Sequence, residues 1–225
     1  ISQYGIFSKK VFWNLQPKEL EEISIRQKDA KKTDLGAISV NTGKFTGRSP
    51  KDRFIVNDKK TRKNVFWSNI NIPIESNCFD LLYKEMTDYL LNKDIYVRDA
   101  FACDHPKHKL KVRIINEYPW SNLFCYNMFL RPNDSELKEF DPSWLVLNVP
   151  GFKADPKRHG TRQENFSIIN FTKKIVIIGG TAYTGEIKKS IFSVLNFTLP
   201  FEKNILSMHC SGNVGDKGDT SVFFG

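Results

Sequence analysis

The chain has 225 residues, 40% of them hydrophobic and 13% aromatic, which is enough to bury the core of one large domain or two small ones. Its 34 Lys and Arg against 25 Asp and Glu give a formal net charge of +9 at pH 7. The basic residues alternate with acidic and aromatic ones and form no long basic run. This distribution argues against a nucleic-acid partner and favours small anionic ligands.

Cysteine spacing and hydropathy indicate the cellular compartment in which we expect the protein. Cys78, Cys103, Cys125 and Cys210 lie far apart and form no Cys-x-x-Cys pair, so we expect reduced thiols in a cytoplasmic protein. No segment approaches the roughly 18 consecutive apolar residues of a membrane span, and the first residues do not resemble a signal peptide, so we expect no membrane contact. The chain starts at Ile1 without an initiator Met, and we expect it to be part of a longer protein.

Apolar periodicity divides the chain into alternating helices and strands. Three- and four-residue steps predict helices over 17–28, 75–93 and 119–130, and a further helix starting near Gly185. Alternating or continuous apolar runs predict strands over 36–40, 53–56, 95–103, 110–118, 144–149, 166–171, 175–178, 205–210 and 220–224. Segments 151–163 and 212–218 are predicted loops. The mixture predicts an α/β fold of the mixed α+β kind, with a mixed sheet flanked by helices.

The first informative motif is residues 41–52, Asn-Thr-Gly-Lys-Phe-Thr-Gly-Arg-Ser-Pro-Lys-Asp. Its glycines leave backbone amides exposed, and Lys44, Arg48 and Lys51 add cationic donors, which is what an anion pocket needs. The planar guanidinium of Arg48 can hold a carboxylate or phosphate by two hydrogen bonds, whereas a lysine acts as a point charge. A polar surface turn has the same composition, and the residues alone leave both interpretations open.

The second motif, Gly-Gly-Thr-Ala-Tyr-Thr-Gly-Glu-Ile-Lys-Lys at 179–189, directly follows an apolar run and predicts a strand, a glycine turn and a helix start. Lys188 and Lys189 must each be solvated or find an anion. At a separation of about 6 Å their repulsion is roughly 3 kcal/mol at an effective dielectric of 20, so one of them would lose its proton more easily. A neutral lysine can bind a metal, with His209 as a candidate second ligand. A solvated lysine pair is the alternative.

Other polar side chains are less specific. Tyr183 lies at the tip of the glycine turn, where its phenol can hydrogen-bond a substrate oxygen or simply pack. His105 and His108 flank Pro106, which favours an exposed turn over a metal site. The predicted strand 205–210 would place His209 on the face opposite to Met208 and Cys210.

Three motifs in order, 41–52, 179–189 and Met-His-Cys-Ser-Gly-Asn-Val-Gly at 208–215, resemble the ATP-dependent phosphoenolpyruvate carboxykinases, and the resemblance extends along essentially the whole chain. The shorter segments 99–101, 127–132 and 164–166 are also similar to that family. The chain departs from the family pattern at four positions: Ala182 replaces a common Trp, Thr184 a Gly, Gly212 an Ala and Arg53 a Lys.

The resemblance implies a carboxy-lyase of gluconeogenesis that converts oxaloacetate and ATP to phosphoenolpyruvate, carbon dioxide and ADP, with Mn²⁺ or Mg²⁺ bridging substrate and nucleotide. By position, Arg48 would hold a substrate carboxylate, Tyr183 would contact the carboxyl group being lost, and Lys188 would face the phosphoryl groups. Lys189 and His209 would ligate the metal. Gly225 falls where the family's phosphate-binding loop begins.

The resemblance also implies a division into domains. Residues 1–203 correspond to the amino-terminal substrate-binding domain, and residues 204–225 to the start of the nucleotide-binding domain, ending before the phosphate-binding loop. We therefore expect a monomeric cytoplasmic parent enzyme, and a chain that is inactive by itself because it lacks a phosphate cradle. The alternative is a non-catalytic fragment that only binds small dicarboxylate or phosphate anions. A nucleic-acid binder, which would show steeply salt-dependent binding, ranks last.

Overall fold

The computed structural model describes residues 1–224, and the chain divides into two compact units. The first unit is Ile1–Ser190 and the second begins at Ile191. The boundary falls inside helix α6 (Gly185–Lys203). The division into domains between residues 203 and 204 is inferred from the family resemblance. It concerns which ligand each part binds, and it stays a prediction.

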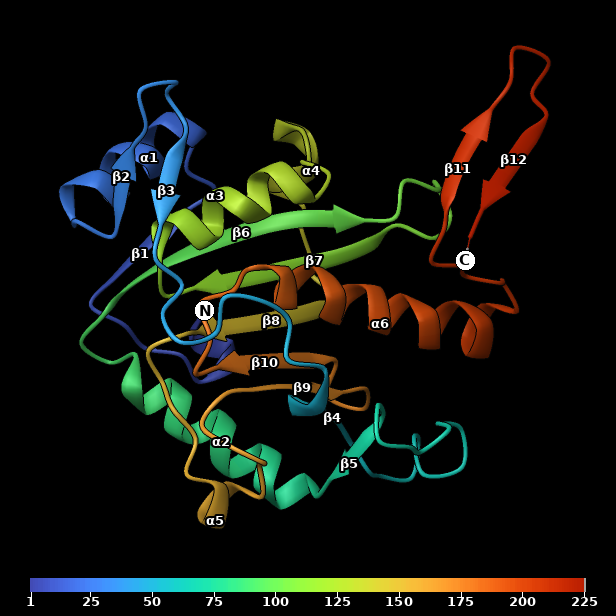
Figure 1. Ribbon diagram of the computed structural model, residues 1–225, viewed down its shortest axis with the longest axis horizontal. Helices are drawn as coiled ribbons and strands as arrows, with labels where there is room; N and C mark the ends of the chain where they lie inside the picture. Colours follow the sequence, from blue (N-terminus) through green and yellow to red (C-terminus); the bar gives the residue numbers. More distant parts are fainter. Residues whose placement is uncertain (225) are drawn as a thin grey trace. The chain divides into compact units, whose positions relative to one another are not determined.

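The first unit is built on a sheet of eight strands in the order β1-β6-β7-β8-β10-β9-β4-β5 (Figure 1). These are β1 (Lys10–Trp13), β6 (Asp94–Ala102), β7 (Leu110–Asn116), β8 (Trp144–Val149), β10 (Ile175–Gly179), β9 (Phe166–Asn170), β4 (Arg53–Val56) and β5 (Ile72–Ile74). The pairs β6–β7 and β9–β10 are antiparallel, and the other neighbours are parallel. The predicted mixed sheet is thereby confirmed.

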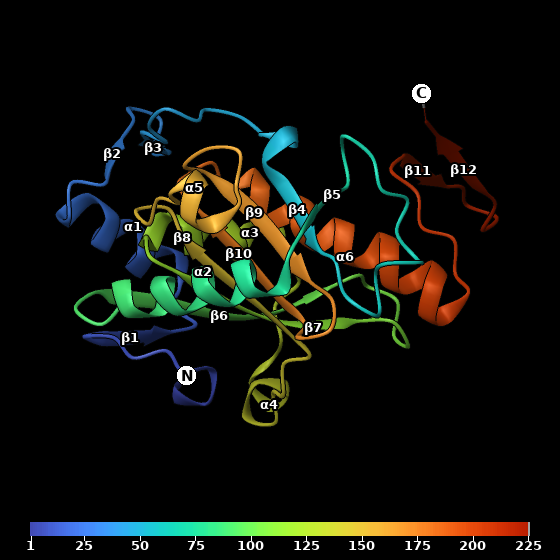
Figure 2. The same cartoon turned by 90° about the horizontal axis from the view of Figure 1, so that it is seen from below.

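One face of this sheet is covered by α2 (Ser76–Tyr89), as Figure 2 shows. Phe79, Leu82 and Met86 recur at helical spacing on α2, and they lie in one buried cluster with side chains of seven strands. The strand side chains of this cluster include Phe54, Val97, Ile115, Leu147, Phe166 and Ile177. Full burial of each such side chain contributes about 1.5–3 kcal/mol, so this layer is the main core of the unit.

The opposite face is covered by α1 (Pro17–Arg26), α3 (Pro119–Met128) and the first turns of α6. Leu20 and Ile23 of α1 pack against Tyr96 on β6, a residue that alternates with the α2-facing Val97. At the start of α6, the hydroxyl groups of Ser190 and Ser167 lie 2.8 Å apart. Helix α6 therefore begins against β9, on the face that α2 does not cover.

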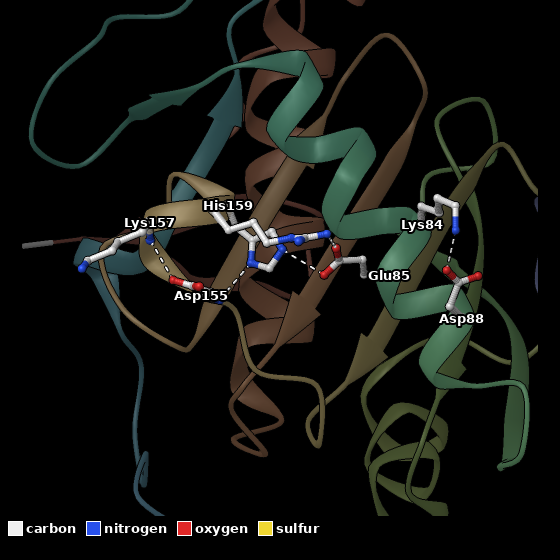
Figure 3. A network of polar contacts seen from close by, with 7 residues as sticks. Lys84, Glu85, Asp88, Asp155, Lys157 and His159 are labelled. Carbon is white, nitrogen blue, oxygen red and sulfur yellow. Dashed lines mark hydrogen bonds and ion pairs between the residues drawn. The ribbon is translucent and has the colours of Figure 1, made fainter.

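A short helix, α5 (Pro156–His159), is fastened to α2 by the network in Figure 3. Nδ1 of His159 accepts the Asp155 backbone N–H at 2.8 Å, so Nε2 carries the proton and faces Glu85 at 3.0 Å. The Asp155 side chain caps the helix by accepting from the Lys157 N–H at 3.0 Å. His159 is buried, and these contacts give it a structural role.

Most of the predicted elements are confirmed, with ends that differ by a few residues. The helices predicted over 17–28, 75–93 and 119–130 are α1, α2 and α3, and each is shorter than predicted. The strand predicted over 36–40 is β3 (Ile38–Val40), which pairs antiparallel with β2 (Ala30–Lys32). Periodicity missed the short elements β1, β2, β5, α5 and α4 (Asp134–Lys138), which are too brief to carry a pattern.

The prediction for 205–210 is wrong. In the second unit these residues form no strand, and the strand pair is instead β11 (Ser211–Val214) with β12 (Thr220–Phe223), in an antiparallel hairpin. The predicted loop 212–218 is therefore also wrong in its first residues. The Ile205 N–H donates to the Leu199 carbonyl at 3.0 Å, so residue 205 closes the end of α6. Alternating apolar residues favour a strand only where a neighbouring strand supplies hydrogen bonds.

Candidate functional site

The loop 41–52 connects β3 to β4 and is fixed at both ends. At its start, the Gly43 N–H donates to Oδ1 of Asn41 at 2.8 Å, and Gly43 has the left-handed φ of 74°. At its end, the buried Asp52 accepts from Arg162 at 2.9 and 2.7 Å and from Gln163. The basic side chains Lys44 and Arg48 between these anchors are exposed.

The middle of this loop is held by Glu186, the second residue of α6. Oε1 of Glu186 accepts the Ser49 backbone N–H at 2.9 Å, and Oε2 accepts Nε and Nη2 of Arg53 at 2.9 and 2.8 Å. The Glu186 side chain is only 2% exposed, so these charge-assisted bonds form away from bulk water. Arg48, the residue before Ser49, is thereby tied to the helix that carries Lys188 and Lys189.

The turn 179–185 depends on its glycines. Gly180 has φ 67°, and a Cβ there would lie 2.2 Å from the Glu164 carbonyl oxygen, so only glycine fits. The Tyr183 N–H donates to Oγ1 of Thr181 at 3.2 Å. A Cβ on Gly185 would lie 2.4 Å from the Tyr183 ring. The glycine at the start of α6 therefore leaves room for the Tyr183 ring to fold over it.

The cations of the two motifs share one electrostatic environment. Burial lowers the pKa of Lys189 from its ordinary value, and the charges of Arg48, Arg53 and Lys188 lower it further. The Glu186 carboxylate opposes this effect in part. Lys188 is exposed and Lys189 is half-buried. The charges of Arg48 and Lys188 thus act on Lys189, and such repulsion between cations is relieved when an anion binds.

A cavity of about 460 Å³ is lined in part by residues of both motifs. Its lining includes residues 41–45 from the loop and Gly180 and Ala182 from the turn, together with the stacked rings of Tyr118 and Trp120. Glu164 at this cavity pairs with Lys44 at 3.5 Å and with Lys153 at 3.3 Å. Sequence reasoning missed the aromatic pair. Its only signal was two aromatic residues flanking a helix-starting proline.

The aromatic wall of this cavity also carries a donor. Burial raises the pKa of Tyr118 to about 12, so its phenol stays protonated at neutral pH and can donate a hydrogen bond. The cavity thus combines a flat aromatic wall with lysines that are partly neutralised by Glu164. Arg48, Tyr183, Lys188 and Lys189 do not line it.

Two of the predicted site residues lie beyond the first unit. His209 is exposed in the second unit, outside any strand, and its ring centroid lies 5.3 Å from that of Phe192. Gly225 lies outside the described residues. Within residues 1–224 no group of three or more His, Cys, Asp or Glu side chains is placed to hold a metal. Lysine does not belong to that set, and the Lys189–His209 pair stays a prediction.

His105 and His108 form the exposed turn that Pro106 predicts. The His108 N–H donates to the His105 carbonyl at 2.9 Å, and the Lys107 N–H donates to Nδ1 of His105 at 3.2 Å. The two rings lie 4.6 Å apart. In the described part of the chain, no helix combines the length and the apolar character that crossing a membrane requires.

Fold and motifs together define a mixed α/β protein in which the loop 41–52 and the start of α6 carry cationic side chains. The family model described as phosphoenolpyruvate carboxykinase matches residues 9–225. The chain is 57% and 52% identical over 225 residues to proteins named phosphoenolpyruvate carboxykinase (ATP) from Christiangramia forsetii and Flavobacterium johnsoniae. It is 47% identical over 216 residues to the protein of that name from Geobacillus kaustophilus. The chain therefore belongs to the family of ATP-dependent phosphoenolpyruvate carboxykinases.

These alignments cover 100%, 100% and 96% of this chain, but only 42%, 42% and 41% of the three relatives. The chain thus spans about two fifths of the length of the curated relatives it matches.

Proposed function

We propose that this chain is the oxaloacetate-binding part of an enzyme that converts oxaloacetate and ATP to phosphoenolpyruvate, carbon dioxide and ADP, the reaction its relatives' names imply. One observation carries the proposal: the Glu186 carboxylate joins the loop of Arg48 to the helix of Lys188 and Lys189. A dianionic substrate is matched by three cations held in this way. The names of the relatives identify which anion is expected.

The roles follow from the chemistry of each side chain. The exposed guanidinium of Arg48 offers a planar pair of donors for a substrate carboxylate. The Tyr183 phenol, folded over Gly185, lies on the turn beside the lysines and contacts the carboxyl group that leaves. Decarboxylation develops negative charge on the enolate oxygen, which nearby cations stabilise. Lys188, the exposed lysine, neutralises charge on the phosphoryl group that ATP transfers.

The proposed metal ligands are Lys189 and His209. The donor chemistry fits, because the lowered pKa of Lys189 makes its nitrogen lone pair more available, and His209 has an exposed imidazole. Two nitrogen donors favour Mn²⁺ over the harder Mg²⁺. When bound, the metal supplies Lewis-acid stabilisation of the enolate and phosphoryl oxygens.

We further propose that the parent enzyme is a cytoplasmic monomer without nucleic-acid or membrane partners, and that this chain by itself does not turn over. A second candidate function is a non-catalytic module that binds small dicarboxylate or phosphate anions. The observation that favours it is that Arg48, Lys188 and Lys189 all belong to the first unit, where the charges of Arg48 and Lys188 lower the pKa of Lys189.

Calorimetry with oxalate, a stable dicarboxylate, tests both functions on this chain and on a version extended with the remaining sequence of a relative. Phosphoenolpyruvate formation is assayed in both. We expect oxalate to bind both proteins, Arg48→Met to weaken binding at least about tenfold, and the exposed-arginine control Arg62→Met to leave it unchanged. If the extended protein forms phosphoenolpyruvate and this chain does not, the result supports the enzymatic function. Absence of turnover in both, with oxalate still bound, leaves only the anion-binding module.

The metal ligands have a separate test. In the extended protein, Lys189→Met should lower Mn²⁺ affinity, while Lys138→Met, which removes an exposed lysine on α4, should not. The measurement is Mn²⁺ binding followed by electron paramagnetic resonance, which requires no activity. Equal Mn²⁺ affinity of Lys189→Met and the parent would exclude Lys189 as a ligand.

A further inference from the structure

A second cavity, lined by two arginines and two aspartates among other residues, lies elsewhere in the first unit. It has a volume of about 220 Å³, and its lining includes Asn14, Gln16, Arg98, Tyr126, Arg131 and Asp134. It shares no lining residue with the larger cavity, and neither the loop 41–52 nor the turn 179–185 contributes to it. Whatever it binds is therefore independent of the proposed carboxykinase site.

Arg98 is a buried cation without a counter-charge. It is 3% exposed, and its Nε and Nη2 donate to Oδ1 of Asn122 at 3.1 and 2.9 Å, while Nη2 also donates to the Leu15 carbonyl. Both acceptors are neutral. In residues 1–224, no carboxylate lies within the 4.0 Å of an ion pair with Arg98, and its Nη1 has no hydrogen-bond partner.

Neither carboxylate that lines the cavity forms an ion pair with Arg98. Asp99 is held by Arg113 on β7, whose Nε and Nη2 donate to its two oxygens at 2.7 and 2.9 Å. Asp134 is exposed in the first turn of α4. Burying an arginine with only neutral partners is costly, because the guanidinium stays charged in the interior. Burial lowers the pKa of Arg98, Cys125 and Tyr126 raise it, Arg131 lowers it, and Asp99 raises it.

Arg131 contributes a second guanidinium to the same cavity. The Arg98 and Arg131 guanidinium carbons lie 5.0 and 4.7 Å from the centroid of the Tyr126 ring, so one ring positions both cations. Nη1 of Arg131 donates to the Tyr126 carbonyl at 2.9 Å, which fixes the side chain further. Nη1 of Arg98 and the remaining donors of Arg131, with the amides of Asn14 and Gln16 in the same lining, form a site for oxygen acceptors.

We propose that this cavity binds a small oxyanion, the phosphate or carboxylate group of a compact metabolite, between Arg98 and Arg131. Its volume corresponds to about seven water molecules at roughly 30 Å³ each, which suits such a group with a short carbon chain. The bound anion supplies the counter-charge that Arg98 lacks.

The probes are inorganic phosphate and malonate, titrated separately into the full chain while the side-chain Nε–H signals of its arginines are followed by NMR. We expect the Arg98 signal to shift and saturate with at least one probe, with a millimolar dissociation constant. Arg131→Gln, a change at an exposed position, should weaken this binding at least about tenfold. Arg62→Gln, which removes the same charge from an exposed site outside the cavity, should leave it unchanged.

The two probes distinguish the sources, since saturation by phosphate alone indicates a phosphorylated metabolite and saturation by malonate alone an organic acid. The Arg98 Nε–H signal is assigned as the one that disappears from the spectrum of Arg98→Met. The proposal is wrong if the Arg98 signal responds to neither probe, or if Arg131→Gln binds as tightly as the parent chain.

Discussion

Glu186 and Arg53 form a two-point ion pair in which Nε and Nη2 of the arginine donate to a single carboxylate oxygen at 2.9 and 2.8 Å. The other oxygen of Glu186 holds the Ser49 backbone. One buried side chain at the start of α6 thus sets both the position of the Arg48 loop and the field around Lys189. A lysine at position 53 would supply no such planar pair of donors.

Glu186→Gln should therefore lower the free energy of unfolding by about 2–3 kcal/mol, because a partly buried Arg53 is left without its counter-charge. The Arg48 loop loses its anchor as well, so oxalate affinity should fall. Urea unfolding and calorimetry measure the two effects. Glu22→Gln is the control, because Glu22 is exposed and forms no ion pair within residues 1–224. If the free energy of unfolding of Glu186→Gln stays within about 0.5 kcal/mol of the parent, Glu186 does not stabilise the protein through Arg53 and Ser49.

Gly185→Ala tests whether the position of Tyr183 matters for binding. The added Cβ would lie 2.4 Å from the Tyr183 ring, which must swing away, while alanine favours the helix slightly. We expect unchanged or slightly higher stability together with weaker oxalate binding. Gly47→Ala meets nothing within 4 Å and should leave both unchanged. If Gly185→Ala binds oxalate as the parent does, Tyr183 takes no part in holding the anion.

The sequence predicted the long elements well because burial imposes a period on them. Phe79, Leu82 and Met86 repeat at the helical period on α2, and the continuous run 175–178 marks a strand buried on both faces. β5 escaped prediction because it is three residues long with Pro73 in the middle, which only an edge strand tolerates.

The site was predictable in residue type but not in arrangement. Glycines, Arg48 and adjacent lysines indicated an anion site without any structure. The hydrogen bond from Ser49 to Glu186 joins residues 137 positions apart, and no local pattern reports such a contact. The sequence also does not reveal that Arg98 is buried with neutral hydrogen-bond partners, because its burial and its bond to Asn122 arise only when β6 packs under α3.

Gly180→Ala should be among the most destabilising changes at a small residue. The left-handed φ of 67° costs an alanine about 1–2 kcal/mol, and its Cβ would lie 2.2 Å from a backbone oxygen that cannot easily move. We expect a loss of about 3 kcal/mol or more in urea unfolding. Gly36→Ala separates the two causes, since its φ is 87° but nothing lies within 4 Å, and it should cost only the strain. Equal losses for both variants would show that the contact with the Glu164 carbonyl is relieved by a small shift.

Thiol reactivity tests the packing of the α3 side of the sheet. All four cysteines are free, and burial raises the pKa of Cys125 to about 12, because no water reaches a thiolate there. At pH 8 its thiolate fraction is about one in ten thousand, and iodoacetamide has no access to it. Cys210 is exposed. Peptide mass spectrometry of the native chain should find Cys210 alkylated and Cys125 unmodified, whereas in urea both react. Equal native rates at the two positions would mean that α3 does not stay packed against the sheet in solution, so that its Cys125 becomes accessible.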